Sequence, residues 1–394
     1  MRRNSKVGNV QLMQKLNRTR VFDCIRRNEH VTRPTISAET GLSLSSITNI
    51  VTYLLEKEFV CEHDLDKAGH VGRKATLLRV NSNKYSIACV IIDNRRQIKA
   101  ACMDLCGGIR FETKLQSVIE NAQDAENAAA QAISRIIEKC GDDSVAAAAI
   151  SVPGMVLDGG KEIVSASMRW TGLDLKTPLS EKFGIPVFIQ NASIARAMWM
   201  LKELRGGKIG TGEYERNAVF MDLEQGIGAV QFMDQSVNPF FLGEIGHTTV
   251  ERGGDKCTCG NRGCLELYCS AEKAVSDYGV PGASFADVIK AADSGDEKAG
   301  EILVRCGEYL GTAFASVIHL INPSTIYING AELLESDIIY RTATEWANRH
   351  CYSQLVRDMK YVKVSAREDS ELDGLLEYSL DRLFDYESKH CIIE

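Results

Sequence analysis

The sequence contains no run of eighteen or more apolar residues, the length that a membrane-spanning helix requires. The residues after Met1 are charged or polar, so the apolar core of a secretory signal is also lacking. The cysteine pattern does not indicate a disulfide-bonded protein, because most of the thirteen cysteines stand singly in apolar stretches, where a reduced thiol behaves as a small hydrophobe. We therefore expect a cytoplasmic protein without membrane insertion. Its 394 residues suffice for two or three compact units.

Positive charge is scarce in the chain as a whole but not at its start. Residues 1–80 hold 14 Lys and Arg against 8 Asp and Glu, a net charge of +6, whereas residues 81–394 hold 32 against 45, a net charge of −13. These two values give the total of −7. A basic segment on an acidic body is typical of a protein that binds the phosphate backbone of DNA, although a solvated surface has the same composition.

The first sixty residues carry the signals of three helices. Apolar residues recur at helical spacing over 9–28, which predicts a first helix or a helix pair, and Thr32 and Ser43 are typical N-caps for two further helices. Gly41, between them, is a typical C-terminal stop. The third helix is predicted to run to about Glu58 with an apolar stripe of Ile47, Ile50, Val51, Leu54 and Leu55. Two helices joined by a glycine turn predict a helix-turn-helix.

The polar face of that third helix is a candidate DNA surface. Ser45, Ser46 and Asn49 lie opposite the apolar stripe and Thr48 lies at its edge, so their side chains could reach base edges or phosphates in a major groove. An alternating strand at 75–80 then predicts the wing of a winged helix, with Arg73 and Lys74 placed to follow a minor groove. An ordinary solvated face and a hairpin tip with two chance basic residues are the alternatives.

Beyond residue 81 the pattern changes to strands alternating with helices. Apolar strand-like runs occupy 85–92, 98–105, 145–152, 218–223, 228–232 and 325–328, and helical patterns occupy 122–140 and about 298–320. Such alternation predicts mixed α/β sheets. We expect two lobes with a ligand cleft between them, since ligands of these folds bind beyond the carboxyl ends of strands.

One cluster of cysteines has the spacing of metal ligands. Cys257, Cys259 and Cys264 lie in a glycine-framed loop ten residues after His247, whereas Cys269 falls outside that loop. Three thiolates and one imidazole form the donor set of a closed structural zinc site. The sequence therefore predicts one structural zinc ion per chain, with a cluster of buried reduced cysteines as the alternative.

These blocks together carry a family resemblance. The chain resembles the ROK family of repressors and sugar kinases, and within it the repressors that respond to glucose, xylose or N-acetylglucosamine. Besides the N-terminal helices, the matching motifs are Val152-Pro153-Gly154, Asp158-Gly159-Gly160, Phe188-Ile189-Gln190-Asn191, Gly243-Glu244-Ile245-Gly246-His247 and Cys-x-Cys-Gly-x-x-Gly-Cys-Leu-Glu at 257–266. The resemblance implies a winged helix-turn-helix followed by a two-lobed, actin-like or hexokinase-like ATPase fold.

The resemblance also implies a sugar site. In family members that bind hexoses, the matching positions hydrogen-bond the sugar hydroxyls, which here are Asn191, Glu244, His247 and Glu266. Carboxylates accept from vicinal hydroxyls and an amide fixes orientation, so the set suits a sugar. His247 would hold zinc through one ring nitrogen and face the sugar with the other. Purely structural roles for Glu244 and Glu266 are the alternative.

Three departures from the family pattern argue against kinase activity. The kinases of the family have an Asp after the Asn, as the base that activates the sugar hydroxyl, where this chain has Ala192. The first phosphate loop, Asp-x-Gly-x-Thr in the kinases, is replaced by Asp93-Asn94-Arg95-Arg96-Gln97. The second loop keeps Gly226 and Gly228 but carries Glu224 before them, a carboxylate where nucleotide phosphate would approach.

We accordingly expect a kinase-dead repressor that binds operator DNA and a sugar or sugar-phosphate effector as a homodimer or tetramer. The expected domains are a winged helix-turn-helix at 1–80, a first lobe at 81–194 and a second lobe with the zinc loop and dimer interface at 195–374. A C-terminal helix at about 375–394 would pack back on the first lobe. An active sugar kinase with a DNA-binding domain, and a constitutive DNA-binding protein controlled by a protein partner, are the rival functions.

Overall fold

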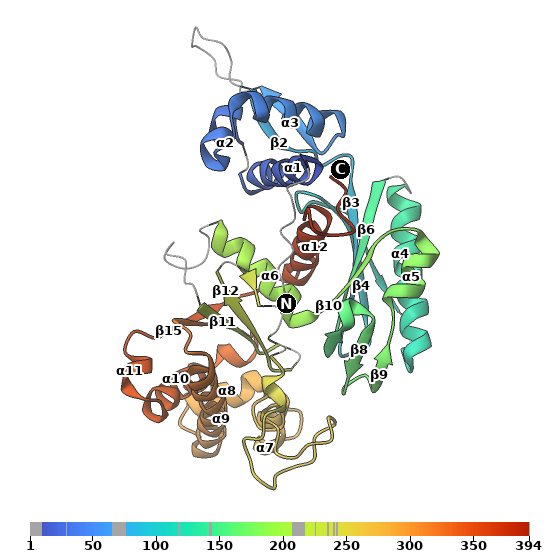
Figure 1. Ribbon diagram of the computed structural model, residues 1–394. Helices are drawn as coiled ribbons and strands as arrows, with labels where there is room; N and C mark the ends of the chain where they lie inside the picture. Colours follow the sequence, from blue (N-terminus) through green and yellow to red (C-terminus); the bar gives the residue numbers. More distant parts are fainter. Residues whose placement is uncertain are drawn as a thin grey trace, which may run out of the picture.

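A computed structural model describes residues 10–28, 30–64, 76–116, 119–141, 144–206, 217–224, 226–234, 236–238, 241 and 243–393. Figure 1 shows three parts in chain order: a small helical module, a first sheet with its helices and a second sheet with its helices. Arg73 and Lys74 lie outside the described residues. No helix in the described ranges is both long and apolar enough to cross a bilayer.

In its described residues, the N-terminal module has three helices and an antiparallel strand pair. The helices are α1 (Val10–Arg27), α2 (Arg33–Thr40) and α3 (Leu44–Glu56), and β1 (Val60–Asp64) pairs with β2 (Thr76–Val80). The predicted caps are confirmed: the Thr32 hydroxyl accepts from Thr35 N, the Ser43 hydroxyl accepts from Ser46 N, and Gly41 has φ +72°. α3 ends two residues before the predicted Glu58, which has a left-handed φ of +58°.

The first sheet has the strand order β10-β6-β3-β4-β5. Its strands are β3 (Ser86–Ile92), β4 (Ile98–Asp104), β5 (Ile109–Leu115), β6 (Val145–Val152) and β10 (Val187–Asn191), of which β3, β6 and β10 are parallel. Helix α4 (Ala122–Cys140) covers one face, as its contacts with β3, β4 and β5 show. A small antiparallel sheet follows β6 and comprises β7 (Met155–Leu157), β8 (Glu162–Ser165) and β9 (Trp170–Leu173), with the short helix η2 (Asp158–Gly160) between β7 and β8. Helix α5 (Lys176–Phe183) then leads into β10.

Strand β3 is buried on both faces, so alternate side chains enter two different cores. One set packs with the C-terminal helix α12 (Ser370–Leu383) and the other with α4. The first set is Ile87, Cys89 and Ile91, and the second is Ala88, Val90 and Ile92. Helices on both faces explain why this strand is a continuous apolar run rather than an alternating one.

The second sheet has the order β13-β12-β11-β14-β15. Its strands are β11 (Asn217–Asp222), β12 (Gly228–Met233), β13 (Ser236–Val237), β14 (Thr325–Asn329) and β15 (Lys360–Val364). Helix α6 (Ala192–Arg205) packs on one face. The other face is covered by a group dominated by α9, namely α7 (Ala271–Tyr278), α8 (Phe285–Asp293), α9 (Glu297–Ile321), α10 (Asp337–His350) and α11 (Ser353–Val356), with the short η3 (Ile245–His247), η4 (Leu265–Leu267) and η5 (Leu333–Glu335) in the loops.

Helices α6 and α12 pack against each other between the two sheets (Figure 1). A Cβ at Gly374 would lie 1.7 Å from the Ala195 carbonyl oxygen, so this close crossing requires a glycine. The expected lobe borders at 194/195 and 374/375 therefore fall inside α6 and α12. The helix expected at about 375–394 instead spans Ser370–Leu383, because acidic residues open its first turn and the tail folds back through the Ile392 N–H bond to Leu383 O.

The N-terminal module shares a hydrophobic core with α12. Phe22 of α1 stacks on Phe384 at a ring centroid distance of 3.8 Å. Arg26 of α1, only 9% exposed, pairs with Glu377 at 2.5 Å and with Asp381 at 3.1 Å, both on α12. The module is therefore docked on the body through apolar and ionic contacts, and both involve the last helix of the chain.

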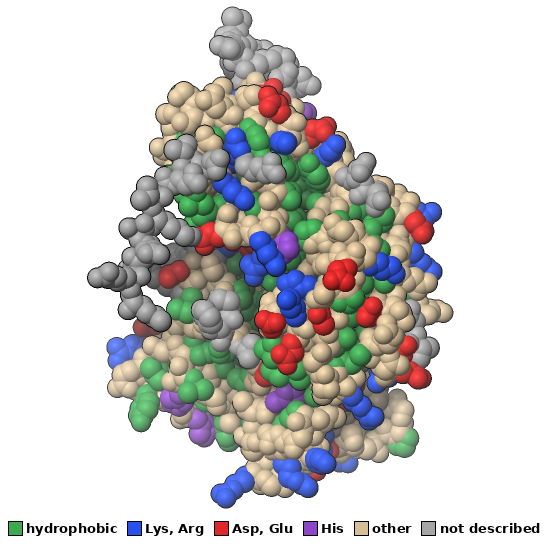
Figure 2. All heavy atoms as spheres, turned by 45° about the vertical axis from the view of Figure 1, so that its right-hand side comes forward, with side chains coloured by type: hydrophobic (Ala, Val, Ile, Leu, Met, Phe, Trp, Pro, Cys, Tyr) green, Lys and Arg blue, Asp and Glu red, His purple; other side chains and the backbone are tan. Residues whose placement is uncertain are grey.

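Charged side chains of both signs are interspersed on the face shown in Figure 2, without one broad patch of a single sign. The acidic excess of residues 81–394 is thus spread out on this face rather than gathered into one region.

Candidate binding cleft and metal centre

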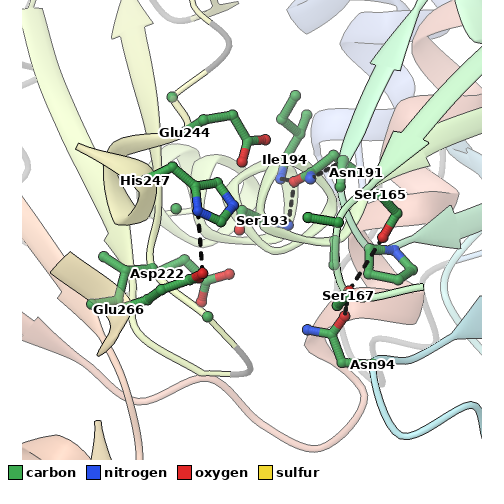
Figure 3. A pocket seen from close by; sticks show the side chains of 18 of the residues that line it. Asn94, Ser165, Ser167, Asn191, Ser193, Ile194, Asp222, Glu244, His247 and Glu266 are labelled. Atoms are coloured by element: carbon green, nitrogen blue, oxygen red, sulfur yellow. Dashed lines mark hydrogen bonds and ion pairs between the residues drawn. The ribbon is translucent and has the colours of Figure 1, made fainter. Parts of the chain in front are cut away.

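A cleft lies between the two sheets and is lined from both. Its space, counted with the part open to solvent, is about 970 Å³. Figure 3 shows Glu244, His247 and Glu266 on one side, facing Asn191 and Ser193, with Asn94, Ser165 and Ser167 on the other side. The lining residues follow the ends of β3, β6, β10 and β11, as expected of α/β sheets.

The four predicted metal ligands are brought together beside the cleft. One donor atom each from His247, Cys257, Cys259 and Cys264 lies within 4.8 Å of the others. The Cys259 and Cys264 sulfurs are 3.7 Å apart, close to the roughly 3.8 Å that two thiolates take in a tetrahedral site with Zn–S bonds of about 2.3 Å. The donor set and its spacing therefore fit zinc. Cys269 lies outside the cluster, 3.5 Å from the Cys306 sulfur in the core.

Tight turns bring the thiols of this loop together. The Cys257 N–H donates to Asn261 O and the Gly263 N–H donates to Asp255 O. Gly263 has φ +72°, and a Cβ there would lie 1.8 Å from the Glu251 carbonyl oxygen. Glycine is thus required for the loop to close against the backbone at Glu251.

His247 is held at the border between the metal cluster and the cleft. Its Nδ1 lies 3.1 Å from Glu266 Oε1 and 3.7 Å from the Cys257 sulfur, which leaves Nε2 for the cleft. The hydrogen bond with Glu266 raises the pKa of His247 to about 9, against the opposing effect of burial. Burial alone would raise the pKa of Glu266, but its hydrogen bonds to His247 and Cys257 lower it overall. The surroundings of Nδ1 therefore favour positive charge.

Glu244 stands opposite the start of α6. It lines the cleft, and burial raises the pKa of its carboxyl group. The negative charge of Glu266 adds to this rise, whereas His247 opposes it. Two acceptor carboxylates thus face the same cavity, an arrangement able to accept hydrogen bonds from a polyhydroxylated ligand.

Asn191 lines the cleft, but its amide is bonded to the backbone. Its Oδ1 accepts from Ser193 N at 2.8 Å and Ile194 N at 3.3 Å, and its Nδ2 donates to Gly154 O at 2.5 Å. The residue is the N-cap of α6. Its capping role was not predicted from the sequence, and the predicted sugar contact stays a prediction.

A buried charged network forms the floor of the cleft. Arg196 of α6 is 11% exposed and pairs with Asp222 of β11 at 2.9 Å and with Glu371 of α12, which also accepts from the Ser151 hydroxyl. Burial opposes the charge of Arg196, but the two carboxylates raise its pKa above the ordinary value. Burial raises the pKa of Glu371 despite Arg196. This network joins the two lobes.

Sequence reasoning missed this network and had little signal to find it. Asp222 and Glu371 lie far from Arg196 in the chain. The one available sign is an arginine among the apolar residues of α6. Ser165, Ser167, Ser193 and Thr258 were missed for the same reason, since hydroxyl side chains at scattered positions form no pattern.

The residues that stand in place of the kinase phosphate loops form hydrogen bonds within this chain or begin a helix. Asp93 to Gln97 closes a tight hairpin between β3 and β4, in which Asp93 Oδ1 accepts from Gln97 N at 2.7 Å. Glu224 accepts from Ala331 N at 3.1 Å and from Asn329 Nδ2 at 3.5 Å. Ala192 begins α6 and offers the cleft a methyl group.

The predicted DNA-facing residues lie at the start of α3. Ser45, Thr48 and Asn49 are exposed, whereas Ser46 is half-buried with its hydroxyl 2.9 Å from that of Ser43. Leu44, which was not predicted, is 54% exposed beside them. A large apolar side chain exposed at a helix start is suited to contact a thymine methyl group.

Comparison with known proteins gives consistent matches. The model of the family described as the ROK family matches residues 94–377. The xylose repressor of Bacillus subtilis (strain 168) is 24% identical, over 96% of this chain and 98% of its own length. The DNA-binding transcriptional dual regulator NagC of Escherichia coli (strain K12) is 27% identical, over 86% of each chain.

Solved structures agree in fold. A ROK family transcriptional regulator, described as a homolog of the E. coli MLC protein, matches with a TM-score of 0.77 and 25% identity over 95% of this chain and 98% of its own. A ROK family glucokinase from Streptomyces griseus, in complex with glucose and AMPPNP, matches with a TM-score of 0.59 and 20% identity. That match covers 74% of this chain and 98% of the glucokinase.

Proposed function

The chain belongs to the ROK family, and we propose that it is a sugar-responsive DNA-binding repressor of genes for carbohydrate uptake or catabolism. The observation that carries this proposal is the extent of the matches. The xylose repressor and the transcriptional regulator cover about the whole chain, whereas the glucokinase covers about three quarters of it. The part beyond the kinase match is as long as a DNA-binding module.

The residues of the cleft support loss of kinase activity. Ala192 cannot accept a proton from a sugar hydroxyl. In the 93–97 hairpin the amides of Arg96 and Gln97 donate to Asp93, and the amide of Ala331 donates to Glu224. A coupled ATPase assay with a hexose panel tests this; ATP-dependent formation of a sugar phosphate would replace the repressor proposal with that of an active kinase.

A structural zinc ion, held by His247, Cys257, Cys259 and Cys264, completes the proposed site. Zinc would supply rigidity rather than chemistry, because a closed four-ligand site leaves no open position for substrate. The loop it stabilises carries His247 and Glu266, both of which line the cleft. Metal and sugar binding are therefore expected to depend on each other.

For DNA binding, we assign the start of α3 to the major groove, with Ser45, Ser46, Thr48 and Asn49 facing bases or phosphates. Arg73 and Lys74 are assigned to the wing. A homodimer would present two such modules to half-sites one or more helical turns apart on a palindromic operator. Fluorescence anisotropy with labelled DNA from upstream of the protein's own gene tests DNA binding. An anisotropy that does not change with protein concentration at low salt would contradict the proposal.

Helix α12 offers a direct route from the cleft to the module. Its first turn carries Glu371 in the cleft floor, and Glu377 and Asp381 farther along the helix pair with Arg26. A thousandfold loss of operator affinity requires about 4 kcal/mol of differential sugar binding. Anisotropy titrations with and without sugars measure this coupling, and an unchanged affinity with every sugar would favour control by a protein partner.

A further inference from the structure

The charge of the cleft bears on which form of a sugar it can hold. Among the described residues that line it, five are carboxylates and Arg196 is the one lysine or arginine. The carboxylates are Asp93, Asp222, Glu244, Glu266 and Glu371. Gln225 and Leu242, which adjoin lining residues in the sequence but lie outside the described ranges, carry no charge.

The single guanidinium is already paired. Arg196 donates to Asp222 through Nε at 3.0 Å and Nη2 at 2.9 Å, and to Glu371 through Nη1. Proteins recognise phosphate esters through guanidinium or ammonium groups that are free to form bidentate or multiple bonds. A phosphate would have to displace one of these two buried carboxylates, which would then be left without its partner.

Backbone amides are the other usual donors to phosphate, and two sets here are already bonded. The α6 N-terminus directs its Ser193 and Ile194 amides to Asn191 Oδ1. Beyond the cleft floor, the amide of Ala331 donates to Glu224 Oε1. The glycine turn at 226–228 comes shortly after Asp222, already counted among the five carboxylates, and after Glu224, which adds one more carboxylate close to it in the chain.

Positive charge at the metal centre does not offset this excess. Three thiolates outweigh one Zn²⁺, so a Cys₃His zinc centre remains formally negative. His247 is itself a ligand of that centre and lies 3.1 Å from Glu266, so its imidazole adds no separate positive charge to the wall. Burial is the main cause of the raised pKa of Glu371, Arg196 opposes the rise, and the negative charges of Asp222 and Asp93 add to it.

We infer that the effector is an uncharged sugar and that the carboxylates of this cleft exclude its phosphate ester. The inference rests on the proposed function, because it concerns the same site. Hydroxyl groups suit this lining, since Glu244 and Glu266 accept hydrogen bonds and Ser165, Ser193 and Thr258 both donate and accept. A phosphate ester carries a charge of about −1.5 to −2 at pH 7 and would be repelled by the same carboxylates.

Isothermal titration calorimetry of the full-length, zinc-loaded protein tests the inference. The probes are glucose, xylose, mannose and N-acetylglucosamine, each beside its terminal phosphate ester. We expect at least one neutral sugar to bind and its ester to bind at least tenfold more weakly, which corresponds to about 1.4 kcal/mol. This difference in affinity between sugar and ester, here called the gap, should become smaller when KCl is raised from 0.1 M to 1 M, because the Debye length falls from about 10 Å to about 3 Å.

A matched pair of variants separates charge from local structure. Asp93→Asn removes a carboxylate of the cleft while its Oδ1 can still accept from Gln97 N. Asp174→Asn makes the same change at a half-buried residue that does not line the cleft and whose Oδ1 accepts from Thr177 N at 3.0 Å. We expect D93N to reduce the ratio of sugar affinity to ester affinity two- to fivefold and D174N to leave this ratio unchanged.

The possible outcomes are distinguishable. An ester that binds as tightly as its parent sugar, or more tightly, overturns this inference and leaves the sugar-responsive repressor standing. A gap that is insensitive to salt and equal in both variants overturns the electrostatic explanation. No heat with any sugar or ester overturns the inference together with the proposed sugar response.

Discussion

Replacing Arg26 by alanine should undock the N-terminal module from the body. The guanidinium is 9% exposed and lies 2.5 Å from Glu377, which is itself 9% exposed, and 3.1 Å from Asp381. It is thus the link between α1 and two carboxylates of α12. Its removal leaves both carboxylates without their partner from the module.

The size of the effect follows from what remains after the substitution. Removing one partner of a buried ion pair typically costs about 3–5 kcal/mol. Glu377 would keep Lys202 at 2.9 Å, and Asp381 is 36% exposed, so solvent would screen part of the loss. We therefore expect about 3 kcal/mol, which shifts the docking equilibrium by roughly 150-fold.

Hydrogen exchange followed by mass spectrometry measures this shift segment by segment. Amides of α1 and of the last turns of α12 should exchange faster in Arg26→Ala, whereas those of β11 and β14 should not change. Arg27→Ala is the control: Arg27 is 52% exposed and its pair with Asp23 is 3.9 Å long, so we expect less than about 0.5 kcal/mol.

Equal exchange in the two variants would refute the reasoning, since it would mean that the buried network does not hold the module. If docking is also the route of the sugar signal, Arg26→Ala should bind sugar normally and lose the sugar dependence of DNA binding. A variant that keeps the full response would contradict the role proposed for α12.

Three further predictions concern the metal, pH and the helix crossing. The purified chain should contain one zinc ion, and chelation should lower both the sugar affinity and the melting temperature. Cys259→Ser should lose the metal, whereas Cys269→Ser should keep it. Normal sugar binding after chelation would contradict this prediction. Burial would raise the pKa of Glu377, but Arg26 and Lys202 together lower it below its ordinary value of 4.5. The contribution of Glu377 to stability is therefore present above pH 4.5 and is lost as the pH falls through the lowered pKa. Glu377→Gln should accordingly flatten the acid side of a plot of unfolding free energy against pH. Gly374→Ala should destabilise by about 3 kcal/mol or more in chemical denaturation, because its Cβ would meet a carbonyl of α6, whereas Gly300→Ala, with open space around it, should be neutral or stabilising.

Much of the local structure could be read from the sequence. Ranges 122–140 and 145–152 were predicted to the residue, because a capped amphipathic helix and a continuous apolar strand are periodic signals. The caps at Thr32 and Ser43 were likewise predicted, since capping depends on residues three apart. The metal cluster was accessible for the same reason: its cysteines lie within eight residues of one another and its histidine ten residues before them.

The residues that form the floor of the cleft could not be predicted from local patterns in the sequence. Asp222 and Glu371 come from strands and helices that meet at Arg196 only after both sheets have formed. The C-terminal helix shows the limit clearly, since its predicted range began five residues late and missed the turn that carries Glu371. Nothing in its own periodicity reports that this turn enters the cleft.

What the sequence determined by itself is therefore the set of parts: the three N-terminal helices, two of them with their caps, the strands and the Cys₃His loop, each specified by neighbours along the chain. The tertiary structure alone decided how they are connected. α12 leaves the second lobe, crosses α6 at a glycine, inserts Glu371 into the cleft and presents Glu377 to Arg26. Contacts between residues hundreds of positions apart depend on how whole layers pack, and no local pattern in the chain encodes them.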